Sequence, residues 1–140
     1  MSRIKICGLR RPEDIAAVNE ARPDYCGFIV EYPKSRRSID RATLRELVRG
    51  LREEIVPVGV FVNAPKELVA ELLEEGTIQI AQLHGQESQE YIQELKVLTE
   101  KTLIQAFSIK SKEDVERARE SVADYILLDQ GSGGTGKGFD

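Results

Sequence analysis

The feature that most constrains the fold is a regular alternation of short apolar runs with stretches of helical periodicity. The apolar runs, rich in β-branched residues, are predicted to be six strands, at Ile4–Cys7, Tyr25–Val30, Ile55–Val62, Ile78–Leu83, Thr102–Phe107 and Tyr125–Asp129. Their first residues follow one another at intervals of about 21 to 30 residues, which is the length of one β-α unit. Such a repeat implies parallel strands joined by right-handed helical crossovers.

Five stretches between the predicted strands have apolar residues at helical spacing. The clearest stripe consists of Leu44, Leu47, Val48 and Leu51, at positions i, i+3, i+4 and i+7. For the third helix, Asn63-Ala64-Pro65 predicts a cap followed by a first-turn proline. For the fifth, Ser111 with Asp114 three residues later predicts a loose capping box.

Two architectures accommodate this alternation: an open doubly wound sheet and an eight-fold β/α barrel. Six strands and five helices would complete the first and would leave the second two units short. No linker rich in Pro, Gly or Ser interrupts the pattern, so we expect residues 1–140 to form a single domain.

Composition excludes several classes of function. The 20 basic residues are outnumbered by 24 acidic ones, and the net charge of −4 is opposite in sign to that of a typical nucleic-acid-binding protein. No apolar run reaches the roughly 18 residues of a membrane span. The two cysteines, Cys7 and Cys26, do not make a disulfide framework, so we expect a reducing, cytoplasmic location.

Polar residues gather near the carboxyl ends of three predicted strands. Lys5 and Cys7 share one face of the first strand, Gln82 and His84 share a face at the end of the fourth, and Asp129 ends the sixth. In parallel α/β folds the carboxyl ends of the strands carry the active site. The pattern therefore predicts an enzyme site, and the residues alone leave its chemistry open.

Each of these residues also has a structural interpretation. A strand cysteine is often a small core hydrophobe, and we expect this of Cys26. Asp129 could cap the following segment, and His84 could hydrogen-bond a loop. Cys7 differs because the ammonium of Lys5 on the same face would favour its thiolate.

The glycine-rich end of the sequence resembles a phosphate-binding loop. Residues from Gly131 to Lys137 satisfy G-x-x-x-x-G-K, but Gly138 stands where a magnesium-binding hydroxyl is required. We therefore favour a glycine loop that closes over a site at the end of the sixth strand. A phosphate-binding module remains an alternative.

Several motifs together resemble the phosphoribosylanthranilate isomerase family of tryptophan biosynthesis. They are Lys5-Ile-Cys7-Gly8-Leu9, Tyr25-Cys-Gly-Phe28-Ile-Val, Pro33-Lys-Ser-Arg-Arg37, Val58-Gly-Val-Phe-Val-Asn63, Gln82-Leu-His-Gly85 and Leu127-Leu-Asp129 with Gly133-Gly-Thr-Gly-Lys-Gly-Phe-Asp140. The resemblance implies a TIM (β/α)8 barrel that converts N-(5-phosphoribosyl)anthranilate into 1-(2-carboxyphenylamino)-1-deoxyribulose 5-phosphate. It implies no metal and no organic cofactor.

The resemblance also implies roles for individual residues. In this Amadori rearrangement Cys7 matches the general base and Asp129 the general acid. Arg37 matches the arginine that pairs with the anthranilate carboxylate, although the neighbouring Arg36 departs from the usual residue. The remaining residues expected to bind substrate are Lys5, Gln82, His84 and Gly134.

The family continues beyond Phe139-Asp140 into a sixth helix and two further β-α units. We therefore expect these 140 residues to represent the amino-terminal six strands and five helices of the barrel, truncated at the carboxyl end. The phosphate-binding loops of such barrels follow the seventh and eighth strands. Unpaired edges on the first and sixth strands would invite self-association or pairing with a missing carboxyl-terminal segment. A catalytically incomplete barrel fragment is thus the alternative to an active isomerase.

Overall fold

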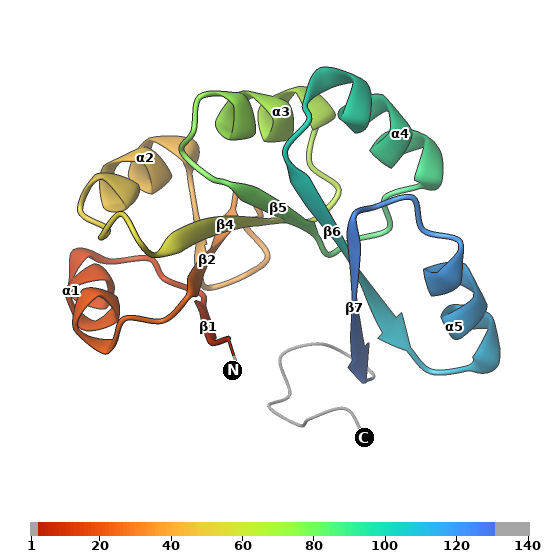
Figure 1. Ribbon diagram of the computed structural model, residues 1–140, viewed down its shortest axis with the longest axis horizontal. Coiled ribbons are helices and arrows are strands. Elements are labelled where there is room, and N and C mark those ends of the chain that lie inside the picture. Colours follow the sequence, from red (N-terminus) through yellow and green to blue (C-terminus); the bar gives the residue numbers. More distant parts are fainter. Residues whose placement is uncertain (1–2, 131–140) are drawn as a thin grey trace.

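The computed structural model describes residues 3–130, in which strands and helices alternate along the chain (Figure 1). The strands are β1 (Lys5–Cys7), β2 (Tyr25–Val30), β3 (Ser38–Ile39), β4 (Val56–Phe61), β5 (Ile80–Leu83), β6 (Thr102–Ile109) and β7 (Tyr125–Gln130). The helices are α1 (Pro12–Ala21), α2 (Arg41–Arg49), α3 (Lys66–Glu74), α4 (Gln89–Leu98) and α5 (Lys112–Arg119).

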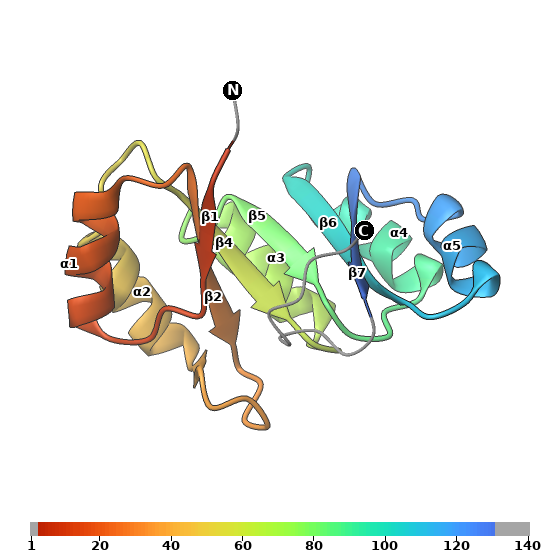
Figure 2. The same ribbon diagram turned by 90° about the horizontal axis from the view of Figure 1, so that it is seen from below.

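Strand order decides between the two architectures that the sequence allowed. The strands lie in the order β1-β2-β4-β5-β6-β7, and every pairing is parallel, with β3 a short addition beside β2. A doubly wound sheet reverses direction at a switch point and so carries helices on both faces. Here successive right-handed crossovers all step the same way, which places the helices on one face, and the sheet curves as part of a barrel (Figures 1 and 2).

The predicted strands are confirmed with small shifts at their ends. β4 and β5 begin one and two residues later than predicted, at Val56 and Ile80, and β6 continues to Ile109. β7 ends at Gln130, so Asp129 is its penultimate residue rather than its last. The two-residue β3 was not predicted, because so short a strand has no readable periodicity.

The expected start of the third helix is wrong in detail. Pro65 is itself the cap of α3, and the helix begins at Lys66 without a side-chain capping bond. Asn63 instead has a positive φ of 51°, and its Oδ1 accepts a hydrogen bond from the backbone of Gln86 at 2.9 Å. Ser111 does cap α5, accepting from the backbone of Asp114 at 3.4 Å.

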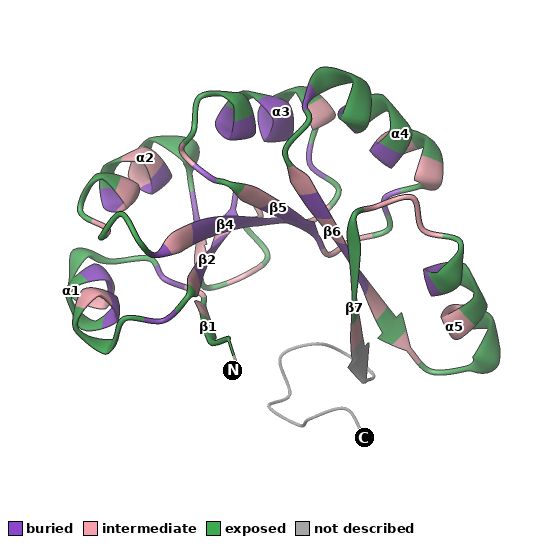
Figure 3. Ribbon diagram, viewed as in Figure 1, coloured by how far each residue is buried: buried purple, intermediate pink, exposed green. Residues whose placement is uncertain are grey.

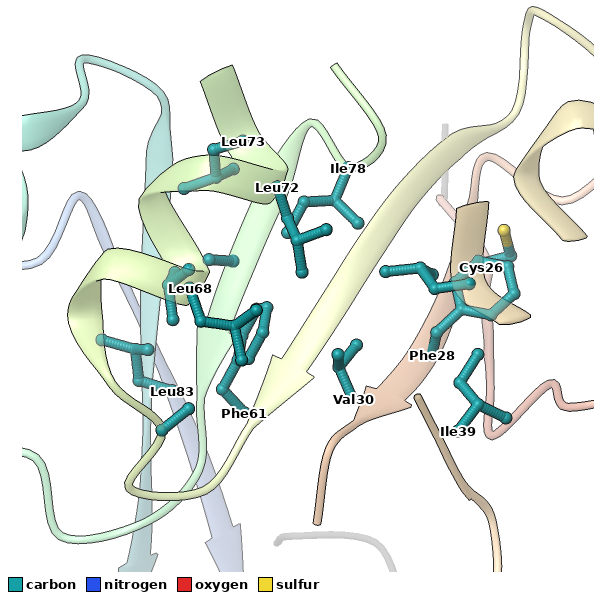
Figure 4. Packing of buried hydrophobic residues seen from close by; sticks show 14 of the residues in the cluster. Cys26, Phe28, Val30, Ile39, Phe61, Leu68, Leu72, Leu73, Ile78 and Leu83 are labelled. Atoms are coloured by element: carbon teal, nitrogen blue, oxygen red, sulfur yellow. The ribbon is translucent and has the colours of Figure 1, made fainter. Parts of the chain in front are cut away.

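The core lies between the convex face of the sheet and the helices (Figure 3). Phe28 and Phe61 project from β2 and β4 into this layer and are fully buried, together with Leu72 and Leu73 of α3 (Figure 4). Cys26 is also fully buried there, which confirms its expected place as a core residue. None of the helices within residues 3–130 is both long and apolar enough to cross a membrane.

The edge strands of the sheet are more exposed than its central strands. β1 and β7 are the two edges of the sheet formed by the described residues. Tyr125, Ile126 and Leu127 of β7 are 65%, 44% and 42% exposed, and Ile4 before β1 is 61% exposed. Soluble proteins rarely leave a row of apolar side chains exposed on an edge strand.

Candidate active site

The candidate site lies at the carboxyl edge of the sheet. Because all strands are parallel, their carboxyl ends meet at this edge. β1 ends at Cys7, β5 is followed directly by His84, and β7 carries Asp129 next to its end. The fold therefore places the three residues that the sequence singled out at one edge of the sheet.

Lys5 and Cys7 both lie on the concave face, over Gly27 of β2. Gly27 is the register partner of Cys7. A Cβ atom built on Gly27 would lie 2.7 Å from Cys7 Sγ and 3.2 Å from Lys5 Cε. Ile6, between them in sequence, packs against the core on the opposite face. This arrangement agrees with the predicted alternation, and it requires a residue without a side chain at position 27.

A chain of polar groups links Lys5 to the end of β5. The ammonium of Lys5 donates a hydrogen bond to Oε1 of Gln82, and Nε2 of the same amide lies 3.4 Å from Nδ1 of His84. Gln82 is only 4% exposed, although its side chain is on the concave side of the sheet. Desolvation lowers the pKa of Lys5, while the nearby Cys7 opposes that shift, since a negative charge on the sulfur stabilises the ammonium.

Arg37 lies against the loop that follows β1. Gly8 has a φ of +85°, and a Cβ atom there would lie 2.7 Å from Arg37 Cδ and 3.0 Å from its Nη1. The backbone amides of Gly8 and Leu9 both donate to the carbonyl of Gly27, at 2.9 and 3.2 Å. Only a glycine combines this backbone conformation with so close an approach of a side chain. The structure thus brings Arg37 next to Cys7, although 30 residues separate them in sequence.

A strongly basic pocket of about 430 Å³ joins Cys7 to Arg37. It is lined by Cys7, Gly8, Leu9, Arg10, Arg11, Asp14, Arg36 and Arg37. The carboxylate of Asp14 is occupied by the backbone amides of Arg10 and Arg11, each at 3.1 Å, and these bonds lower its pKa. Four guanidinium groups against one carboxylate suit an anionic ligand.

The backbone of Asp129 lies opposite Ser108 in the register of β6 and β7. Gly134 and the rest of the glycine-rich segment, residues 131–140, lie outside the described residues, so the structure does not place them. Among the side chains that the structure describes, those of residues 3–128, no group of three or more His, Cys, Asp or Glu is arranged to hold a metal ion.

Several residues that shape the site were not identified from the sequence. Two of them are glycines that allow side chains to pack closely, Gly8 and Gly27. The third is Arg10, which forms a contact between two loops. A glycine within an apolar strand indicates that another group approaches the backbone closely, and Gly27 fits this pattern. No sequence pattern indicates the role of Arg10, because its partner is a backbone carbonyl far along the chain.

Comparison with known proteins gives a consistent result over the whole chain. A family model described as "N-(5'phosphoribosyl)anthranilate (PRA) isomerase" matches residues 4–140. An N-(5'-phosphoribosyl)anthranilate isomerase from Caldanaerobacter subterraneus is 42% identical over 144 residues, which cover 100% of this chain and 68% of that protein.

Solved structures agree with the sequence relatives. Phosphoribosyl anthranilate isomerase from Thermus thermophilus is similar with a TM-score of 0.80 and 35% identity, covering 99% of this chain and 68% of that one. A phosphoribosyl anthranilate isomerase in complex with reduced 1-(o-carboxyphenylamino)-1-deoxyribulose 5-phosphate has a TM-score of 0.79 and 34% identity. That similarity covers 93% of this chain and 66% of the other.

Proposed function

The chain belongs to the N-(5'-phosphoribosyl)anthranilate isomerase family, and on that premise we propose how its residues serve the reaction. The function is the isomerisation of N-(5'-phosphoribosyl)anthranilate in tryptophan biosynthesis. The chain spans about two thirds of the length of the relatives that it matches, and its residues 3–130 form strands and helices of a β/α barrel. We also propose that residues 1–140 belong to a single β/α-barrel domain.

In the proposed mechanism Cys7 is the general base. The rearrangement needs a group that removes the proton from the second carbon of the sugar, and a thiolate can do so. The observation that supports the assignment is the shared position of Cys7 and Lys5 over Gly27, at the carboxyl edge of the sheet where the proposed substrate pocket begins. The sulfur is exposed to the pocket, where a substrate can reach it.

Asp129 is the proposed general acid. Opening of the furanose ring requires a proton on the ring oxygen, and a carboxyl group that is protonated before the step can supply it. The support for this role is the place of Asp129 next to the carboxyl end of β7, at the same edge of the sheet as Cys7. The two catalytic groups would then act from different strands on different atoms of the sugar.

Arg37 is proposed to bind the anthranilate carboxylate. Its guanidinium belongs to the basic pocket that begins at Cys7, and a planar guanidinium can pair with both oxygens of a carboxylate. Lys5, Gln82, His84 and Gly134 are proposed to contact the remainder of the substrate. The proposal involves neither a metal nor an organic cofactor, and it places the enzyme in the cytoplasm, where free cysteines such as Cys7 stay reduced.

Substitution of the two proposed catalytic residues tests this mechanism. The loss of substrate fluorescence is followed for Cys7→Ala and Asp129→Ala in a version of the protein that has the full length of its relatives, with Cys26→Ala as the matched cysteine control on the opposite face of the sheet. We expect the first two variants to lose isomerisation while keeping the circular dichroism spectrum of the parent. Near-normal turnover in either variant would contradict its assigned role.

Assay of the unsubstituted 140-residue chain distinguishes the isomerase from the catalytically incomplete fragment. Measurable conversion supports the active enzyme, whereas a folded chain without conversion supports the fragment. We further propose that copies of the chain associate through the exposed edges β1 and β7. Sedimentation velocity at several concentrations tests this, and a concentration-independent monomer would contradict it.

A further inference from the structure

We propose that Arg10 is a positioning residue for Arg37: it holds the loop that carries Arg37 against the loop after β1, and so sets the affinity for an aryl carboxylate. This inference rests on the proposed role of Arg37. It gives Arg10 a role that neither the motifs nor the reaction chemistry predicts.

The loop between β2 and β3 is held in shape mainly by its own residues. Within it, the amide of Tyr32 donates to Ser38 Oγ at 2.7 Å, and the amide of Ser35 donates to the carbonyl of Tyr32 at 3.0 Å. The amide of Arg37 donates to Ser35 Oγ at 3.2 Å. These bonds define the local turn, but they do not determine where the turn lies relative to Cys7.

Arg10 supplies a bond between the two loops. Its Nη1 donates to the carbonyl of Arg36 at 3.1 Å, and that carbonyl belongs to the peptide bond that joins Arg36 to Arg37. At its other end, the backbone amide of Arg10 donates to Asp14 in the first turn of α1. Arg10 therefore connects the start of α1 to the backbone directly before Arg37.

The contact between Arg37 and Gly8 explains how the hydrogen bond from Arg10 affects substrate binding. The guanidinium of Arg37 lies where any side chain at position 8 would be, so the two loops fit together closely. The loop after β1 is itself fixed, because Gly8 and Leu9 donate to the carbonyl of Gly27. With that loop fixed, the Arg10 bond sets the position of Arg37 beside Cys7.

Binding of reduced 1-(o-carboxyphenylamino)-1-deoxyribulose 5-phosphate, measured by calorimetric titration of the 140-residue chain, tests the inference without requiring turnover. We expect Arg10→Ala to weaken binding about tenfold, the size of effect produced by losing one hydrogen bond with a charged donor. Arg10→Lys keeps a cationic donor and is expected to restore part of the affinity. Thermal unfolding should change little, because Arg10 is exposed.

Arg11→Ala is the matched control. It removes the same charge from the same pocket, but the side chain of Arg11 pairs with Glu13 rather than with the loop of Arg37. Because Arg11 also lines the pocket, this variant measures what one positive charge of the pocket contributes to binding, and we expect a smaller loss of affinity than in Arg10→Ala. If Arg11→Ala weakens binding as much as Arg10→Ala, the effect is general electrostatics and the inference is wrong.

The double variant Arg10→Ala/Arg37→Ala separates the inference from the proposed function. If Arg10 acts through Arg37, the double variant binds no more weakly than Arg37→Ala alone. If Arg37→Ala does not weaken binding, the proposed role of Arg37 fails. If Arg37→Ala weakens binding while Arg10→Ala does not, or if the two effects multiply, only the inference about Arg10 fails.

Discussion

The sulfur of Cys7 lies in the space that a side chain on Gly27 would occupy. A Cβ atom on Gly27 would come within 2.7 Å of Sγ, closer than carbon and sulfur atoms can approach without displacement. The two residues are register partners on β1 and β2, so their separation is set by the hydrogen bonds of the sheet. The absence of a side chain at position 27 is therefore what allows Cys7 its place.

Gly27→Ala is expected to reduce isomerase activity about 100-fold, because a shift of about 1 Å in the position of a catalytic group lowers the reaction rate by about that factor. Gly50→Ala is the matched control, since a Cβ there would have its nearest neighbours at an ordinary 3.6 Å. Turnover and the rate of Cys7 alkylation are measured in both variants. Unchanged values of both in Gly27→Ala would show that Cys7 adjusts without loss.

Lys5→Met is expected to slow alkylation of Cys7 by iodoacetamide at neutral pH several-fold. The substitution keeps much of the stem that packs over Gly27 but removes the positively charged group that lies beside the sulfur being alkylated. Gln82→Leu should have a smaller effect in the same direction, because it removes the partner that holds the ammonium in place. The rate is followed by mass spectrometry, and equal rates in Lys5→Met and the parent would contradict the proposed influence of Lys5.

Cys26 is expected to make the protein sensitive to alkali. Burial raises the pKa of its thiol to about 12 from an ordinary 9.0. Between these values the unfolded chain loses the proton while the folded chain keeps it, so the free energy of unfolding falls as pH rises. The stabilising contribution is fully present below pH 9 and is lost progressively above it.

Urea unfolding at pH 7.5 and pH 10 checks this dependence, with Cys26→Ala for comparison. The alanine variant starts from a lower stability, because it leaves a cavity in the core. Its free energy of unfolding should then fall less between the two pH values than that of the parent protein. Equal losses in the two proteins would show that Cys26 does not contribute to the alkaline sensitivity.

Glu87→Ala is expected to lower the free energy of unfolding by about 2 to 4 kcal/mol, through two amides left without acceptors. The buried carboxylate of Glu87 accepts from the backbone amides of Asn63 and Gly85, at 2.8 and 2.9 Å. These bonds join the loops that follow β4 and β5, next to His84. Gln86→Ala, an exposed neighbour, should change stability by less than about 0.5 kcal/mol. A similar small effect for Glu87→Ala, measured by urea unfolding, would contradict this account.

Much of the fold follows from local pattern. The β-α alternation predicted six strands and five helices, and the period of two along β1 placed Lys5 and Cys7 on one face. These features depend on spacing along a few residues, which the sequence contains in full. The family, too, follows from short motifs in order along the chain.

Other features were out of reach of local pattern. Asn63 looked like a helix cap, yet its side chain bonds to Gln86 in the next loop, because tertiary partners outweigh local capping preference. The bond from Arg10 to the carbonyl of Arg36 depends on which loops meet at the edge of the sheet. Every residue has a backbone carbonyl, so the sequence does not indicate which carbonyl accepts this hydrogen bond.

By itself, the sequence determined six of the seven strands, the five helices, the faces on which Lys5 and Cys7 lie, and the family. The β-α alternation alone also allowed a doubly wound sheet, and the barrel was implied only through the family that the motifs resemble. The strand order of the tertiary structure shows the barrel arrangement directly, with the helices of residues 3–130 on one face of the curved sheet. The tertiary structure also decided that Arg37 packs on Gly8 beside Cys7. The physical reason is that periodicity records which face a residue prefers, whereas strand order and contacts between loops depend on how distant segments fill the same space.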